Sequence, residues 1–168
     1  MTPAGGAGGN SQSNQGLDFG LVGRTVVGIG TDVIEVSRIK QALERPGFMK
    51  RVYSESEIAY CLGSNQSVDA VDSDKSDAYN VSELTDLAIQ RFAVRFTAKE
   101  AVLKAMGVGL GAVKFADIST LSSESGAPEL VLTGTAQALA QKQGISGWLV
   151  SLSHSDLVAQ AFVAATGD

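Results

Sequence analysis

The chain has 168 residues, of which 44% are hydrophobic, and a formal net charge of −5 at pH 7. This length fits one globular domain, and the acidic balance argues against nucleic acid as a partner, because nucleic acid is bound by basic surfaces. The single cysteine, Cys61, excludes an internal disulfide framework and is typical of a reducing compartment. No apolar run is long enough to predict a membrane span, and no signal peptide is visible, so we expect a cytoplasmic protein.

The first segment, residues 1–20, is rich in Gly, Ser, Asn and Gln and has almost nothing to bury. This composition predicts a disordered tail. We therefore expect a single folded domain over residues 21–168.

The first predicted elements are a strand of β-branched residues over 25–30 and a helix that follows it. Thr31 or Asp32 is expected to cap this helix, which runs to about Leu43. Between residues 35 and 51 the chain has five basic residues against two acidic ones. This local excess indicates either an ordinary solvated helix face or a docking patch for an acidic partner.

The next helix is predicted by a capping-box pattern, in which Ser54 is followed three residues later by Glu57. It is expected to run through Leu62. Residues 63–80 are polar and rich in aspartate, and we expect a mobile surface loop. Part of this segment has the ligand spacing of a calcium loop, but Asp77 stands where that turn needs glycine, so we do not expect calcium.

The longest predicted element is a helix that begins at Val81 or Ser82 and ends at a glycine-rich turn, 107–111. Glu100 and Lys104 are four residues apart and therefore lie one above the other on this helix. A basic stripe at the same spacing comprises Arg91, Arg95 and Lys99. The charged face is either a solvated surface or a carboxylate that holds a metal, beside cations that hold phosphate.

The last third of the chain is predicted to be mostly β-structure. The expected strands cover 115–121, 130–132, 148–153 and 158–164, with a short helix over 133–143. In the third strand, Trp148, Val150 and Leu152 are expected to face one way, and Leu149, Ser151 and Ser153 the other. His154 is expected in the turn that follows. The element order predicts an α+β fold with helices packed on one antiparallel sheet.

Two carboxylates on separate elements, Asp32 and Glu100, are what a Mg²⁺ site needs. Mg²⁺ takes one or two carboxylates, keeps several waters and binds the rest through substrate phosphates. Lys99, Lys104 and the glycine turn would then supply positive charge and close backbone approach to a phosphate. Each residue also has a plain structural alternative: a helix cap for Asp32, a surface charge for Glu100 and a turn residue for His154.

Three segments of the chain resemble a known family. They are GIGTDVIEVSRI at 28–39, RFTAKEAVLKAMGVGLG at 95–111 and VSLSHS at 150–155. In these segments, and in their order, the chain resembles the holo-acyl-carrier-protein synthases, the small bacterial class of 4′-phosphopantetheinyl transferases. The resemblance implies the α+β fold of that family and a homotrimer with active sites between subunits.

The resemblance also implies a Mg²⁺-dependent reaction that serves fatty acid synthesis. The phosphopantetheine arm of coenzyme A passes to a serine of an apo acyl carrier protein, and adenosine 3′,5′-bisphosphate is released. The alternative is a module that binds coenzyme A or the carrier protein without turnover, against which the intact Asp32, Glu100 and Lys104 count. Neither nucleic acid nor a membrane is expected as a partner.

The resemblance gives each candidate residue a role. Asp32 and Glu100 match the metal ligands of the family and, with Lys104, its catalytic residues. Contacts with coenzyme A are implied for Arg95, Lys99, Lys104, Gly107, Gly109 and His154. Arg38 matches a carrier-docking arginine, and Arg45 lies on the same helix face. The general base is left open between Glu100 and a metal-bound water.

Overall fold

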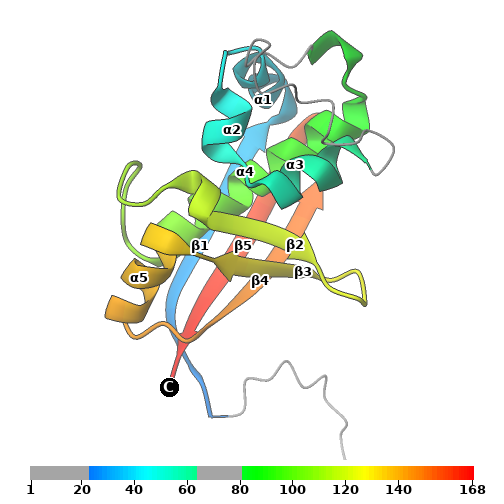
Figure 1. Ribbon diagram of the computed structural model, residues 1–168. Coiled ribbons are helices and arrows are strands. Elements are labelled where there is room, and N and C mark those ends of the chain that lie inside the picture. Colours follow the sequence, from blue (N-terminus) through cyan, green and yellow to red (C-terminus); the bar gives the residue numbers. More distant parts are fainter. Residues whose placement is uncertain (1–22, 64–80) are drawn as a thin grey trace, which may run out of the picture.

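The computed structural model describes residues 23–63 and 81–168, and it has an α+β fold (Figure 1). The elements in chain order are β1 (Thr25–Glu35), α1 (Val36–Leu43), α2 (Phe48–Val52), α3 (Glu55–Leu62), the 3₁₀ turn η2 (Val81–Glu83), α4 (Asp86–Ala105), the 3₁₀ turn η3 (Phe115–Asp117), β2 (Ile118–Ser122), β3 (Pro128–Leu132), α5 (Gly134–Lys142), β4 (Gly147–His154) and β5 (Val158–Gly167). The expected tail, the calcium-like spacing and the loop beyond Gly63 lie outside the described residues. No described helix is long and apolar enough to cross a membrane.

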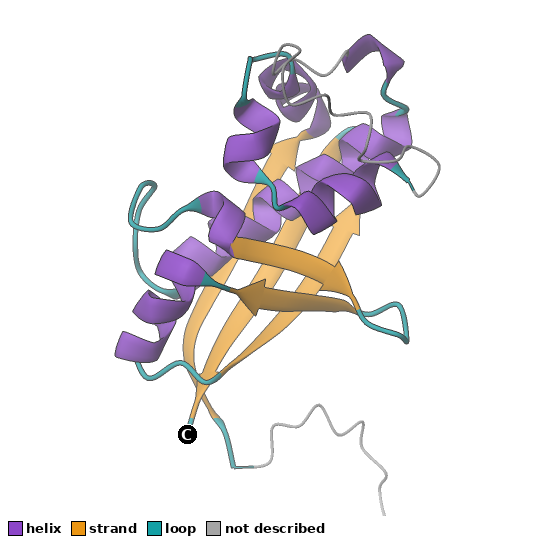
Figure 2. Cartoon of the chain, viewed as in Figure 1, coloured by secondary structure: helices purple, strands orange, loops and turns teal. Residues whose placement is uncertain are grey.

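The strands form two antiparallel sheets rather than the single sheet that we expected. The larger has the strand order β1-β5-β4, and the smaller is the β2-β3 hairpin. In the larger sheet Asp32 pairs with Ala161, which in turn pairs with Leu152. Figure 2 shows α4 lying along one face of this sheet, with the hairpin and the other helices on the same side. The expectation of helices packed on an antiparallel sheet is therefore confirmed.

Two glycines of β1 let α4 approach the sheet closely. A Cβ atom at Gly28 would overlap the carbonyl oxygen of Ala105, and one at Gly30 would overlap that of Ala101. Both positions therefore require glycine for helix and strand to pack as they do. This close packing brings the charged end of α4 beside the middle of β1.

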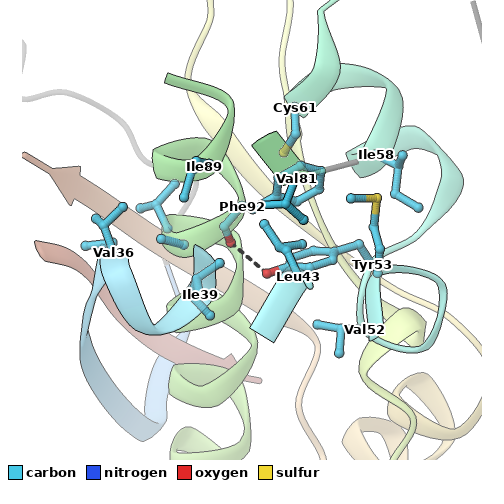
Figure 3. Packing of buried hydrophobic residues seen from close by; sticks show 14 residues of the cluster. Val36, Ile39, Leu43, Val52, Tyr53, Ile58, Cys61, Val81, Ile89 and Phe92 are labelled. Atoms are coloured by element: carbon cyan, nitrogen blue, oxygen red, sulfur yellow. Dashed lines mark hydrogen bonds between the residues drawn. The ribbon is translucent and has the colours of Figure 1, made fainter. Parts of the chain in front are cut away.

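The buried residues form two clusters along α4. The first joins its N-terminal half to α1, α2 and α3, and Figure 3 shows Ile39, Leu43 and Val52 packed around it. The Tyr53 hydroxyl donates a hydrogen bond to the carbonyl oxygen of Phe92, at 3.1 Å, inside this cluster. The second cluster lies between the C-terminal half of α4, α5 and the larger sheet, and Trp148, Val150 and Leu152 pack against it as expected. Both halves of α4 are thus fixed by core packing.

The expected boundary between the first strand and helix is wrong. β1 continues through Asp32 to Glu35, where it still pairs with Val158 of β5. Asp32 is therefore a strand residue and not a helix cap. The β-branched residues between 31 and 34 favour a strand. Pairing with the long strand β5 outweighs the weaker preference of Thr31 or Asp32 for a helix N-cap.

Other boundaries differ in similar ways. The long helix begins at Asp86, where the Thr85 hydroxyl accepts a hydrogen bond from the Ala88 N–H, rather than at Val81 or Ser82. His154 is the last residue of β4 and not a turn residue. The short helix α2 was not expected. The capping box of Ser54 and Glu57 is confirmed, with both reciprocal hydrogen bonds present.

Candidate active site

Asp32 and Lys104 meet at the edge of the larger sheet. Lys104 Nζ lies 2.9 Å from Asp32 Oδ1 and 2.8 Å from the carbonyl oxygen of Thr31. The side chain of Lys104 is 51% exposed and that of Asp32 is 17% exposed. The ammonium group is therefore open to solvent and can exchange its contacts for those of a ligand.

Glu100 lies one helical turn before Lys104 and completes a cluster with Asp32. Burial raises the pKa of Glu100, the nearby charge of Asp32 raises it further, and Lys104 opposes both effects. Two carboxylates that repel each other in a half-buried position are stabilised by a cation between them. Asp32 and Glu100 are therefore suitable Mg²⁺ ligands.

A hard cation with few protein ligands fits this donor set best. Within 23–63 and 81–168 no group of three or more His, Cys, Asp and Glu side chains is gathered for metal binding. Two carboxylates would leave the other coordination positions to water and to phosphate oxygens. That ligand set is typical of Mg²⁺ at phosphate-transfer sites.

The same two carboxylates line a cleft of about 410 Å³ between β1, α1 and α4. Arg38 of α1 and Arg45, which follows the end of that helix rather than lying on its face as expected, both line this cleft, so the structure brings the two predicted docking residues beside the carboxylates. Its apolar lining includes Phe48, Phe96 and Leu110. The lining of the cleft thus combines acidic, basic and apolar side chains.

The glycine turn begins with a Schellman motif at the end of α4. The N–H of Gly107 donates to the carbonyl of Lys104, and the N–H of Val108 donates to that of Leu103, both at 3.0 Å. Gly107 has a φ of 67°, which explains why glycine is needed there. A Cβ at Gly107 or Gly109 would meet no atom within 4 Å, so the backbone of this turn is open to a ligand.

The expectation that Lys99 lies on an exposed stripe beside a phosphate is wrong. Its side chain is fully buried and forms an ion pair of 2.7 Å with Glu57, which is also fully buried. Burial lowers the pKa of Lys99, and the Glu57 carboxylate opposes that shift. Lys99 cannot reach coenzyme A without breaking this pair, because it faces α3 and β2 rather than the cleft.

Arg95 lies on another side of α4 from Glu100. Five residues along a helix correspond to a rotation of roughly 140°. The Arg95 guanidinium lies over the ring of Tyr60, 4.0 Å from its centroid, and Arg91 lies 5.1 Å from the same centroid. Arg95 is 96% buried by this packing, and its Nε has no hydrogen-bond partner in the described part of the chain. Helical spacing within α4 does not predict that Tyr60 joins the two arginines, because Tyr60 lies on α3.

His154 is also separate from the carboxylate cluster. It is exposed at the end of β4, and β5 lies between that strand and β1. Two inter-strand steps correspond to roughly 10 Å. One chain therefore brings together Asp32, Glu100 and Lys104, whereas Arg95 and His154 stand apart from them.

The fold and this cluster can be compared with known proteins. The model of the 4′-phosphopantetheinyl transferase superfamily matches residues 28–162. The chain belongs to this superfamily. Among its curated relatives, the holo-[acyl-carrier-protein] synthase of Gloeobacter violaceus is 38% identical over 141 residues, which are 83% of this chain and 92% of that protein. The synthase of Streptomyces avermitilis is 35% identical over 144 residues, 85% of this chain and 99% of that protein.

Solved structures of the superfamily agree with the observed fold. The acyl carrier protein synthase of Plasmodium yoelii with ADP bound has a TM-score of 0.67 and 32% identity, covering 86% of this chain and 98% of that one. The holo-(acyl-carrier-protein) synthase of Bacillus anthracis in complex with coenzyme A (3′,5′-ADP) has a TM-score of 0.62 and 28% identity, covering 85% and 98%. The family resemblance and the phosphopantetheinyl transferase fold predicted from the sequence are thus confirmed.

Proposed function

We propose that this protein transfers the 4′-phosphopantetheine arm of coenzyme A to a serine of an apo acyl carrier protein. The observation that carries this proposal is the meeting of Asp32, Glu100 and Lys104 beside a cleft that is also lined by two arginines and by apolar side chains. The names of the relatives, and the coenzyme A bound to one of the similar structures, support it.

The reaction is a displacement at phosphorus. The serine oxygen forms a bond to the phosphorus that bears pantetheine, the P–O–P bond of coenzyme A breaks, and adenosine 3′,5′-bisphosphate leaves. When bound by Asp32 and Glu100, Mg²⁺ would neutralise charge on the pyrophosphate. The exposed Lys104 ammonium, released from Asp32, would stabilise the charge that grows on the leaving phosphate. Glu100 or an adjacent water would accept the serine proton.

Carrier docking would involve the arginines that line the same cleft. Acyl carrier proteins are acidic, and the guanidinium groups of Arg38 and Arg45 would attract and orient such a partner. Phe96 and Leu110, which line the same cleft, would contact apolar side chains of the carrier. This arrangement would bring the carrier serine close to Asp32 and Glu100.

A homotrimer with shared active sites is part of the proposal. Gly28 and Gly30 face α4, so the alternating residues Ile29 and Val33 face away from it, 64% and 63% exposed. Phe162 of β5 lies on the same face and is 47% exposed. Copies of the chain would cover this apolar surface.

Shared sites would also explain why the candidate residues fall into two groups. The carboxylate cluster lies at the β1 edge of the larger sheet, whereas His154 lies on β4 at the opposite edge. A neighbouring copy would bring its β4 edge to the β1 edge of the first, so that His154 completes the coenzyme A site across the interface. The cytoplasmic location and the link to fatty acid synthesis stay predictions.

The proposal is tested by the intact mass of an apo acyl carrier protein incubated with this protein, coenzyme A and Mg²⁺. A gain of about 340 Da, which EDTA prevents, is expected for a metal-dependent transfer of the arm. Measurable binding of coenzyme A with no mass gain on several carriers would favour the module without turnover.

A further inference from the structure

The buried ion pair between Glu57 and Lys99 joins three separate parts of the chain. Lys99 Nζ donates to Glu57 Oε2 at 2.7 Å, to the carbonyl of Phe115 at 3.1 Å and to the carbonyl of Ile118. These three bonds use all the protons of the ammonium group. Glu57 Oε1 accepts from the N–H of Thr120 at 2.9 Å. The pair thus connects the start of α3, the middle of α4 and the segment from η3 into β2.

The position of this pair relative to the glycine turn is informative. The chain leaves α4 after Ala105, passes through the glycine turn and residues 112–114, and meets α4 again at Phe115, whose carbonyl accepts a hydrogen bond from Lys99. Lys99 directly precedes Glu100. The glycine turn is therefore held at its start by the end of α4. The segment after it is held by Lys99, the neighbour of the proposed metal ligand Glu100.

A second contact of Phe115, with Phe96, links the segment after the glycine turn to the cleft. The ring of Phe115 packs edge-on against that of Phe96, with 5.6 Å between centroids and an interplanar angle of 76°. Phe96 lines the cleft with Glu100 and with Leu110 of the turn. Any shift of Phe115 away from Lys99 would therefore change the packing of Phe96 in the cleft and the backbone position of the glycine turn.

We infer that Glu57 and Lys99 are positioning residues, which hold the return of the glycine turn against α4 and so fix the backbone of 107–111 beside Glu100. The inference rests on the proposed function, because it concerns the same cleft. Neither residue touches substrate, since both are fully buried. A buried ion pair adds little stability over apolar packing, but its directional hydrogen bonds define one relative placement of the elements they join.

The test compares Lys99→Met, the double variant Glu57→Gln/Lys99→Met and a control, Lys142→Met, which removes an exposed lysine of α5. Amide hydrogen exchange of the free protein should become faster across 107–118, on the order of tenfold or more, while β1 and β5 keep their protection. In the transfer assay, kcat should fall by about 10- to 100-fold, because a small misplacement is costly in rate. The KM for coenzyme A should change by less than about twofold, since Lys99 makes no contact with it.

Two results would overturn the inference. One is a rise in exchange that is equal across β1, β5 and 107–118, which indicates a loss of overall stability only. The other is a raised KM for coenzyme A at unchanged kcat, which indicates a direct contact.

The double variant leaves no unpaired buried charge, so it carries the same test by the same criteria if Lys99→Met does not fold. If the wild-type protein transfers nothing, the proposed function fails. The exchange measurement still decides the positioning role in that case, because it needs no turnover.

Discussion

Lys104 Nζ lies 2.9 Å from Asp32 Oδ1, although 72 residues separate them in the chain. This contact depends on the close approach of α4 to β1, which Gly28 and Gly30 permit. With Glu100 one turn earlier on the same helix, it gathers two carboxylates and an ammonium group beside one cleft.

The approach of α4 to β1 should be sensitive to one methyl group. Gly30→Ala places a Cβ against the backbone carbonyl of Ala101, which cannot move as a flexible side chain would. The overpacking should destabilise the fold by about 1–3 kcal/mol and lower kcat, because it separates Asp32 from Glu100. Thermal unfolding and the mass assay measure both effects.

A matched substitution in open space provides the control. The Cβ atom that Gly109→Ala adds meets no atom within 4 Å, so this substitution should leave the unfolding temperature unchanged. Equal unfolding temperatures for Gly30→Ala and the wild type would show that the close approach is not needed.

Removal of the Glu100 charge should stabilise the metal-free protein at neutral pH and not in acid. Burial, and then the charge of Asp32, raise the pKa of Glu100 above its ordinary value of 4.5. The folded state therefore binds the carboxyl proton of Glu100 more tightly than the unfolded chain does. The free energy of unfolding consequently falls as the pH rises from the unfolded pKa of Glu100 through its higher folded pKa. In EDTA, Glu100→Gln should have a higher Tm than the wild type at neutral pH.

The same experiment has two internal controls. The difference in Tm should disappear well below pH 4.5, where the carboxyl is protonated in both the folded and the unfolded state. Mg²⁺ at neutral pH should raise the Tm of the wild type more than that of the variant. A Tm difference that is independent of pH would contradict the mutual repulsion of Asp32 and Glu100.

Arg38 and Arg45 should act on the carrier and not on coenzyme A. Arg38→Ala should raise the KM for the carrier protein and weaken its dependence on salt, because one attractive charge is lost. The KM for coenzyme A should stay within about twofold of the wild type. Steady-state kinetics at two ionic strengths, with Lys142→Ala as a control, measure this. An unchanged KM for the carrier would remove Arg38 from the docking surface.

Two variants with defects at opposite sheet edges should complement each other if sites lie between subunits. Glu100→Gln damages the β1 edge and His154→Ala the β4 edge, so each alone should lower transfer. Co-expression of the two chains should restore activity above the mean of the separate variants, because some interfaces then pair two intact edges. Activity equal to that mean would contradict the shared site.

The sequence predicted the carboxylate cluster better than its surroundings. Asp32, Glu100 and Lys104 lie in two compact motifs, and spacing within one helix placed the last two together. The role of Asp32 as a strand residue was missed, because strand length depends on pairing with β5, which local patterns do not reveal.

Burial of charged residues was harder to predict. Lys99 belongs to a stripe of basic residues, yet its partner Glu57 lies 42 residues away on another helix. Arg95 is covered in the same way by Tyr60 of α3. Helical spacing predicts which residues share a face, but only tertiary packing decides what that face meets.

The most direct test of the account compares the intact mass of an apo acyl carrier protein after incubation with the wild type, with Glu100→Gln and with the control Glu129→Gln, which changes an exposed carboxylate of β3. Coenzyme A and Mg²⁺ are present in each case. We predict a gain of about 340 Da with the wild type and the control, and none with Glu100→Gln, because one of the two metal ligands is lost. Transfer by Glu100→Gln at a rate near that of the wild type would contradict the assignment of Asp32 and Glu100 to a catalytic Mg²⁺ site.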